Sequence, residues 1–119
     1  MAKVIVLPVF EDSRGSLTVI ENILPFSVNR IYFIYDILEE RGGHRHAKTI
    51  QAMISLGGET LVFTDNGKSQ TEFLLDSPEK CLILEPEDWH TMSCNNSNPT
   101  ILVLASEPYD KDDYIYERY

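Results

Sequence analysis

The chain has 119 residues, of which 43% are hydrophobic and 10% aromatic, and its formal net charge is −9. This length suits one domain with a single core, and the composition is that of an ordered globular protein. The negative charge argues against nucleic acid or an anionic membrane as a partner, because both require a broad basic surface. No apolar run approaches the roughly 18 residues of a membrane span, and no leader pattern precedes Pro8, so we expect a cytoplasmic protein.

Short runs rich in β-branched and aromatic residues, separated by turn signals, predict an all-β chain. In chain order we expect strands over residues 3–9, 16–20, 30–37, 49–56, 59–64, 71–75, 80–84, 91–94 and 100–105. Gly57-Gly58 and the segment Asp65 to Lys68 predict hairpin turns, because Gly and Asn accept positive φ. Residues 110–119 are the only expected helical stretch. This spacing favours an antiparallel sandwich or barrel with a ligand site in its mouth or lumen.

The segment from Arg41 to Lys48 contains two of the three histidines, His44 and His46. Side chains alternate along an extended backbone, so positions 44, 46 and 48 should project together while Arg45 points away. Imidazole exchanges protons near neutral pH and is also the commonest transition-metal ligand. The segment therefore predicts a site for proton transfer or for a metal, and these residues alone leave both possibilities open.

Half of the ten basic residues fall between positions 14 and 48, whereas the C-terminal part is mainly acidic. They are Arg14, Arg30, Arg41, Arg45 and Lys48. A cationic pocket in an acidic protein suits a small anionic ligand, and the planar guanidinium matches phosphate oxygens. These charges favour a phosphorylated or nucleotide-linked metabolite; the alternative is a set of solvated strand and loop charges. The two cysteines, Cys81 and Cys94, are expected to be free thiols, because their spacing fits neither a disulfide scaffold nor a zinc site.

Seven short motifs follow one another along nearly the whole chain. They are DSRGSL at 12–17, RIYFIYD at 30–36, RGGHRH at 41–46, LDSP at 75–78, WHTM at 89–92, VLAS at 103–106 and DYI at 113–115. With a Pro-x-x-Trp-His sequence at 86–90, the chain resembles the cupins and, more narrowly, the sugar-nucleotide 3,4-ketoisomerases. The resemblance implies a cupin-type jelly-roll barrel of antiparallel strands over residues 1–119, forming a homodimer. It also implies a cofactor-independent enzyme that converts a dTDP-linked 4-keto-6-deoxyhexose into its 3-keto isomer, for an amino or N-acylated sugar of a bacterial surface polysaccharide.

The resemblance assigns proton transfer to three side chains. His44 falls on the family's principal base, His46 lies beside the hexose, and Tyr32 falls on the family's tyrosine proton shuttle. A ketone at C4 acidifies the hydrogen at C3, so a base can remove that proton, form an enediol and let C4 be protonated. Strand alternation independently groups Tyr32 with Arg30 and Ile34, and places the more apolar set of residues 31, 33 and 35 on the other face.

Seven further residues are expected to bind the substrate: Arg14, Gly15, Arg30, Arg41, Gln51, Trp89 and His90. Arg14 and Arg41 match positions that hold the diphosphate in the family, and Gly15 would let the backbone approach a bulky anion, although an exposed β-turn explains Arg14 and Gly15 equally well. Trp89 could stack on the sugar or the base, and its alternative is a place in the core or a dimer interface.

Two other functions remain open. A metal-dependent cupin would bind a divalent ion through His44, His46 and His90, but Gln51 stands where such a site usually adds a carboxylate and is a poor ligand. A non-catalytic sugar-nucleotide-binding cupin would keep the arginines and have little need of both His44 and Tyr32.

The chain departs from the family pattern beside its histidines. Relatives usually have a lysine directly after the second histidine, whereas here Ala47 precedes Lys48, which would change face unless a bulge intervenes. The loop between Tyr32 and His44 is also short, which could alter the placement of Arg41 and the epimer that is released.

The two ends of the chain carry expectations about assembly and packing. Residues 4–7 form an apolar edge-strand candidate for dimerisation, because an exposed apolar edge would otherwise aggregate. Residues 109–116 should pack over the barrel, and we expect their deletion to cost solubility before chemistry.

Overall fold

The computed structural model describes residues 1–119 and contains twelve strands and one 3₁₀ helix. The elements are β1 (Lys3–Val6), β2 (Val9–Asp12), β3 (Gly15–Thr18), β4 (Arg30–Ile34), β5 (Arg41–His46), β6 (Gln51–Leu56), β7 (Thr60–Asp65), β8 (Gln70–Leu75), β9 (Lys80–Leu84), β10 (Trp89–Ser93), β11 (Thr100–Ala105), η1 (Lys111–Asp113) and β12 (Tyr114–Ile115). Every strand pair is antiparallel. The expected all-β fold of antiparallel strands is confirmed.

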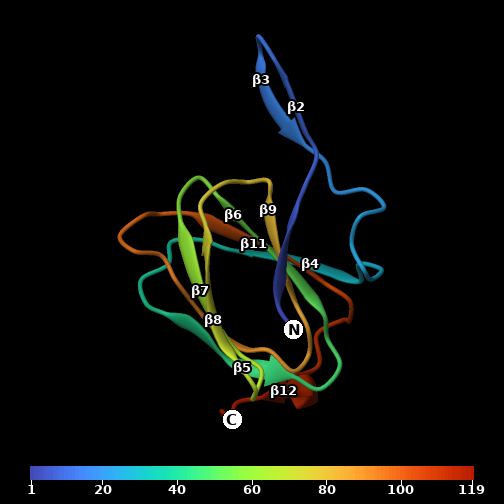
Figure 1. Ribbon diagram of the computed structural model, residues 1–119, viewed down its shortest axis with the longest axis vertical. Coiled ribbons are helices and arrows are strands. Elements are labelled where there is room, and N and C mark those ends of the chain that lie inside the picture. The colour runs from blue at the N-terminus through green and yellow to red at the C-terminus, as the bar shows by residue number, and fades with distance from the viewer.

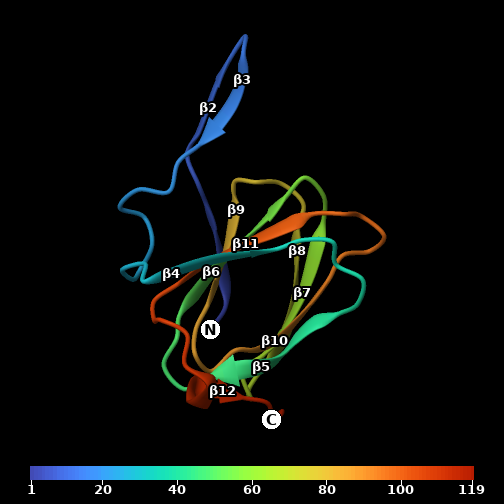
Figure 2. The same ribbon diagram turned by 180° about the vertical axis from the view of Figure 1, so that it is seen from behind.

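Two five-stranded sheets face each other, with the strand orders β1-β9-β6-β11-β4 and β12-β5-β10-β7-β8. The remaining pair, β2 and β3, forms a separate ribbon that projects away from the barrel (Figure 1). The opposite view shows β4 and β11 crossing the barrel and the C-terminal segment lying beside β5 at the far end from the ribbon (Figure 2). The chain thus consists of a barrel with one long arm.

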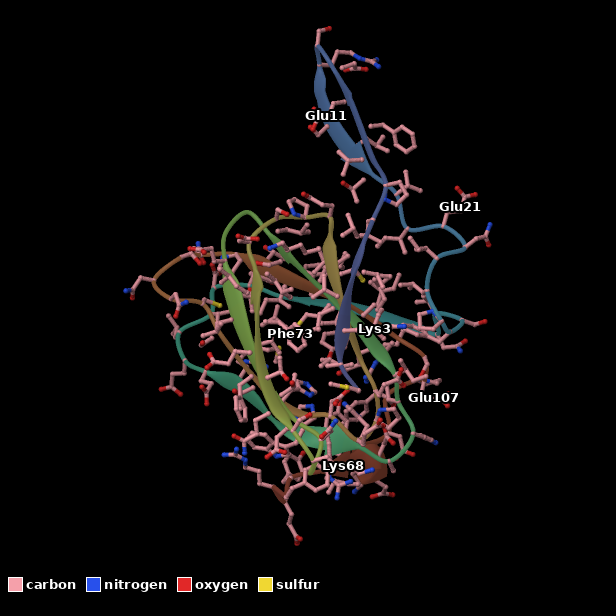
Figure 3. All side chains as sticks on the ribbon, in the orientation of Figure 1. Lys3, Glu11, Glu21, Lys68, Phe73 and Glu107 are labelled. Atoms are coloured by element: carbon pink, nitrogen blue, oxygen red, sulfur yellow. The ribbon has the colours of Figure 1, made fainter.

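The core follows from the alternation of apolar side chains along the strands. In β11, Ile101 and Val103 are fully buried and face the barrel interior, where Phe73 of β8 packs against the same cluster (Figure 3). In β6 both faces are buried, since Ala52 and Ile54 belong to a second apolar cluster on the outside of the sheet. That outer cluster is covered by the segment after β3, which contributes Ile20, Ile23, Leu24 and Phe26.

Several expected elements have different boundaries in the structure. Residues 3–9 are not one strand, because Leu7 and Pro8 separate β1 from β2, and proline cannot donate to a strand ladder. Gly57-Gly58 does not form a hairpin, since β6 and β7 lie in different sheets, whereas the predicted turn over 65–68 does join the paired strands β7 and β8.

The C-terminal expectation is largely wrong. Residues 110–119 contain only the three-residue η1, begun by the Asp110 carboxylate, which accepts from the backbone N–H of Asp112 at 3.0 Å, and the chain then continues as β12. β5 was absent from the expected strands, although the extended His-x-His segment that it contains was expected. No helical segment has the length and apolar character needed to cross a bilayer.

Candidate active site

A cavity of about 340 Å³, here called the His44 cavity, lies between β4, β5, β10 and the C-terminal segment. Its walls come from Arg30, Tyr32, Ile34, Arg41, Gly42, His44, Met92, Tyr109 and Tyr114. The structure therefore brings together two expected proton carriers, Tyr32 and His44, with two expected anion-binding side chains, Arg30 and Arg41. Only these two of the five clustered basic residues line the cavity.

The position of His44 depends on the crossing of β5 and β10. His90 stands opposite His44, and the register shifts at the next residue of β10. Gly42 lies at this shift with φ +90°, and an added Cβ would come within 2.7 Å of the carbonyl oxygen of His90. Only glycine permits both the backbone conformation and the close approach, so Gly42 holds β5 against β10 at the cavity.

The three histidines lie together, as the sequence suggested. The ring centroid of His44 is 5.1 Å from that of His46 and 5.1 Å from that of His90. His90 is 1% exposed and its Nδ1 donates to the carbonyl oxygen of Asp88 at 2.9 Å, because a carbonyl can only accept. Burial lowers the pKa of His90 to about 3, and burial with the nearby His46 lowers the pKa of His44 to about 4. The imidazoles are therefore neutral at pH 7 and able to accept protons. The His, Cys, Asp and Glu side chains form no cluster of three or more suited to holding a metal ion.

His46 is held by a carboxylate to which the sequence assigned no role. Its Nδ1 is 2.9 Å from Oδ2 of Asp113, and both side chains are almost fully buried. Asp113 also accepts from the backbone N–H of Lys48 at 2.7 Å and from the hydroxyl of Thr49. Burial lowers the pKa of His46, and Asp113 opposes that shift. The other ring nitrogen, Nε2, is buried without a protein partner, so Asp113 leaves it with an unused lone pair when Nδ1 carries the proton.

Tyr32 is contacted on two sides. Its hydroxyl accepts from the side-chain amide of Gln51 at 2.9 Å, and the guanidinium of Arg30 lies 5.1 Å from the ring centroid. Burial raises the pKa of Tyr32, while Arg30 and Gln51 act in the opposite direction. The predicted alternation of β4 is confirmed, since Tyr32, Arg30 and Ile34 line the cavity. The other, apolar set faces outward, with Ile31, Phe33 and Tyr35 each about 60% exposed.

The C-terminal segment forms part of the site. The ring of Tyr114 lies 4.8 Å from that of His44 and 4.7 Å from that of His46, and Tyr109 completes the cavity wall. Residues 109–116 pack over the barrel as expected, but their contacts with the histidines mean that removing them would open the cavity. The expectation that solubility would suffer before chemistry overlooked these contacts. The motif at 113–115 was the signal that could have located them.

Six of the ten expected site residues do not line the His44 cavity: His46, which lies beside His44, and Trp89, Gln51, His90, Arg14 and Gly15. Gln51 is 1% exposed and stands behind Tyr32, and His90 stands behind His44. Arg14 and Gly15 lie at the tip of the β2–β3 ribbon, where the Arg14 side chain is 88% exposed and pairs with Asp12 at 2.6 Å. Within one chain, Arg14 therefore stands apart from the histidines.

Trp89 requires a correction, because it points to the opposite side of β10 from His90. Its ring lies 5.0 Å from the guanidinium of Arg118 and 6.3 Å from the ring of Phe63, and its indole N–H donates to the backbone oxygen of Tyr116 at 3.2 Å. These contacts place Trp89 on the outer face of the barrel, away from the His44 cavity.

Lys48 also differs from the expectation that positions 44, 46 and 48 share one face. β5 ends at His46, so the strand alternation does not extend to Lys48. Its side chain is 57% exposed and its ammonium is 3.6 Å from a carboxylate oxygen of Asp110. Lys48 thus forms a surface ion pair with the C-terminal segment and leaves the histidines without an ammonium neighbour.

Comparison with known proteins gives one consistent result. A curated relative from Aneurinibacillus thermoaerophilus, a TDP-4-oxo-6-deoxy-alpha-D-glucose-3,4-oxoisomerase, is 44% identical over 108 residues, which cover 87% of this chain and 78% of the relative. A variant of the QdtA 3,4-ketoisomerase from Thermoanaerobacterium thermosaccharolyticum, solved in complex with TDP-4-keto-6-deoxyglucose, superposes with a TM-score of 0.92 at 32% identity, covering 98% of this chain and 87% of that one. A 3,4-ketoisomerase from Helicobacter canadensis superposes with a TM-score of 0.91 at 31% identity, covering 98% and 90%. The sequence profile of the FdtA family, described as WxcM-like, C-terminal, matches residues 1–119, and the chain therefore belongs to this family.

Proposed function

We propose that this chain is a 3,4-ketoisomerase that converts dTDP-4-keto-6-deoxyglucose into a dTDP-linked 3-keto-6-deoxyhexose. The observation that carries the proposal is the meeting of Tyr32, His44, Arg30 and Arg41 in one cavity, with His46 directly beside His44. The curated relative named as a TDP-4-oxo-6-deoxyglucose 3,4-oxoisomerase supports the choice of substrate.

The reaction needs only proton carriers. His44 takes the proton at C3, the C–H electrons form the C3–C4 double bond, and the C4 carbonyl oxygen takes a proton from Tyr32, which gives an enediol. The C3 hydroxyl then loses its proton to His46 and becomes the ketone, while the proton held by His44 goes to carbon C4. Proton exchange with solvent restores Tyr32 and His46. A neutral imidazole is required at the first step, and the lowered pKa of His44 supplies it at pH 7.

The two arginines in the cavity wall give the substrate its orientation. Guanidinium groups bind phosphate oxygens through paired, charge-assisted hydrogen bonds. Arg41 is separated from His44 by two glycines in β5, and Arg30 stands two residues before Tyr32 on the same face of β4. A diphosphate held by Arg30 and Arg41 would direct the attached sugar toward His44 and Tyr32.

The decisive test is a proton NMR time course of freshly made dTDP-4-keto-6-deoxyglucose in deuterated buffer containing a chelator, comparing the native protein with His44→Asn. We expect the native protein to form a 3-keto product and the variant to lose at least about 100-fold in rate. The coupling at C4 will distinguish the galacto from the gluco product. Conversion that requires added metal would support the metal-dependent alternative, and binding without conversion would support the non-catalytic one.

We further propose a homodimer in which the β2–β3 ribbon of one copy packs on a second copy. The ribbon exposes Phe10 by 62% and Leu17 by 58%, and the outward face of β4 exposes Ile31 and Phe33 by about 60%. β1 and β4 are also the edge strands of their sheet. Apolar surface of this extent on an arm and on a sheet face is typical of a protein interface. We propose that in this arrangement Arg14, at the tip of the ribbon, reaches the cavity of the other copy.

Mixing two variants tests this arrangement. Arg14→Ala and His44→Asn homodimers should each be weakly active or inactive at low substrate concentration. If Arg14 acts on the other copy, exchanged heterodimers contain one intact site, and the mixture should recover about a quarter of the native activity. No recovery, with subunit exchange verified by mass spectrometry, would place Arg14 outside the neighbouring site. A monomeric native protein in sedimentation equilibrium would contradict the dimer.

We propose the cytoplasm as the location and the synthesis of a surface-polysaccharide amino sugar as the pathway. Both cysteines, Cys81 and Cys94, are free, which suits a reducing compartment. Because the product would be a 3-keto sugar, an enzyme that adds an amino group at C3 would consume it directly. Fractionation of the source cell, and coupling of the product to an aminotransferase reaction, test these two statements.

A further inference from the structure

Gln51 was expected to bind the substrate, but it is buried at 1% exposure and does not line the His44 cavity. It begins β6, where Gln51 and Met53 alternate with residues of the outer cluster and face the barrel interior. In the sheet, Gln51 stands opposite Ala105, which stands opposite Arg30. From this position the Gln51 side chain reaches the Tyr32 hydroxyl, with a nitrogen-to-oxygen distance of 2.9 Å.

The direction of this hydrogen bond follows from the number of unpaired atoms. With the Gln51 amide nitrogen 2.9 Å from the Tyr32 oxygen, only one Gln51 atom, Oε1, is buried without a partner. Rotating the amide by 180° would pair Oε1 with the hydroxyl and leave both amide hydrogens without an acceptor in the barrel. Unpaired buried N–H groups are costlier and rarer than under-satisfied carbonyl oxygens. The amide therefore donates.

We infer that Gln51 is a positioning residue whose amide donates to the Tyr32 oxygen, so that the phenolic hydrogen is directed into the His44 cavity toward the substrate carbonyl. This inference depends on the proposed isomerase function. When Tyr32 gives its proton to the C4 oxygen, the electron pair of the broken O–H bond stays on the phenolate oxygen. The phenolate then keeps the Gln51 N–H as a donor and has the Arg30 guanidinium 5.1 Å from its ring.

Two consequences distinguish this role from simple packing. First, a donor aimed at a group that becomes negative in the transition state affects turnover more than binding. Second, the same donor favours the ionised form of Tyr32 even without substrate, because a hydrogen bond to the charged form lowers a pKa. Both can be measured on the whole protein.

The test compares Gln51→Met, which keeps the length of the side chain and removes the donor, with the native protein. We expect kcat to fall by about 10- to 100-fold while KM stays within about threefold. The absorbance titration of Tyr32, taken as the difference between each protein and the same protein with Tyr32→Phe, should move to higher pH. Thr60→Val is the matched control, because it removes a buried hydrogen bond to Ser55 at 2.9 Å in the same barrel and should leave both quantities unchanged.

An unchanged kcat, or an unchanged titration of Tyr32, would overturn the inference. If Gln51→Met does not fold, as judged by its far-ultraviolet circular dichroism, Gln51→Leu replaces it and has the same expected outcomes. If the native protein does not isomerise the substrate, the proposed function fails, and the titration of Tyr32 still decides whether Gln51 acts as its donor.

Discussion

Replacing Asp113 by asparagine tests the link between the C-terminal segment and the chemistry of His46. The carboxylate accepts from Nδ1 of His46 at 2.9 Å, from the N–H of Lys48 at 2.7 Å and from the Thr49 hydroxyl. An asparagine has one acceptor oxygen and can keep the Lys48 bond, while its NH₂ group then faces His46 and Thr49. The amide would donate to Nδ1, so the ring proton would move to Nε2 and the unused lone pair would be lost.

The magnitude follows from the bonds that are lost. Two hydrogen bonds to a buried carboxylate are worth about 1.5–3 kcal/mol each, and the asparagine recovers part of this, so we expect Asp113→Asn to destabilise the protein by about 2–4 kcal/mol. A base held in the wrong tautomer can cost on the order of 10⁴-fold in a well-studied hydrolase, and here we expect kcat to fall by at least about 100-fold.

The assays are the isomerisation rate, thermal unfolding, and the ¹⁵N chemical shifts of His46, which report the position of the ring proton. Thr49→Val is the matched control, because it removes a bond to Asp113 without touching His46 and should lower stability more than kcat. A folded Asp113→Asn protein whose kcat stays within about threefold of native would refute the reasoning. So would an unchanged tautomer of His46.

Three further predictions follow from burial and backbone geometry. Burial lowers the pKa of His44 to about 4 and raises that of Tyr32, so the base stays neutral and the acid stays protonated from about pH 5 to 9. We therefore expect kcat/KM to be constant over this range. A fall in kcat/KM with a midpoint near pH 6.5 would contradict this. The pKa of His90 is about 3 in the folded protein and about 6.5 in the unfolded chain, so the unfolded state binds more protons as the pH falls below 6.5. From this group alone, we expect the free energy of unfolding, measured by urea denaturation, to fall by about 2 kcal/mol by pH 5. Gly42→Ala should lower the melting temperature and the activity, because its Cβ would lie 2.7 Å from a backbone oxygen. Gly43→Ala has open space around its Cβ and should cost about 1 kcal/mol of stability from its positive φ alone. Equal effects of the two substitutions would argue against the close crossing of β5 and β10.

The features that the sequence predicted correctly are those set by neighbouring residues. The alternation in β4 placed Tyr32 with Arg30 on the cavity side, because side chains in a strand alternate whatever the strand pairs with. The turn over 65–68 joined its two strands as expected, because Gly67 has a positive φ of 86° and the Asn66 side-chain oxygen accepts from the backbone N–H groups of Lys68 and Ser69. The order of short motifs was sufficient to predict the family.

Errors arose where a strand boundary was missed. Trp89 and His90 were placed outside the expected strand over 91–94, so alternation could not separate them, and only the observed start of β10 shows that they face opposite sides. The prediction that Lys48 shares a face with His44 and His46 was wrong for the converse reason, because β5 ends at His46 and strand alternation does not continue to position 48. Strand ends depend on which partner strand is present, and a single sequence does not show the partner.

From the sequence alone, the chain was predictable as an all-β protein in which His44, Tyr32, Arg30 and Arg41 belong to one site, and these four side chains do line one cavity. The tertiary structure decided what stands behind those groups: Asp113 reaches His46 across 67 residues of chain, and Gln51 reaches Tyr32 from a different strand of the same sheet. It also decided that Arg14 lies on an arm, away from the cavity of its own chain. The physical reason is the same in each case, because side-chain contacts between distant segments depend on sheet register and closure, whereas alternation and turn geometry depend only on adjacent residues.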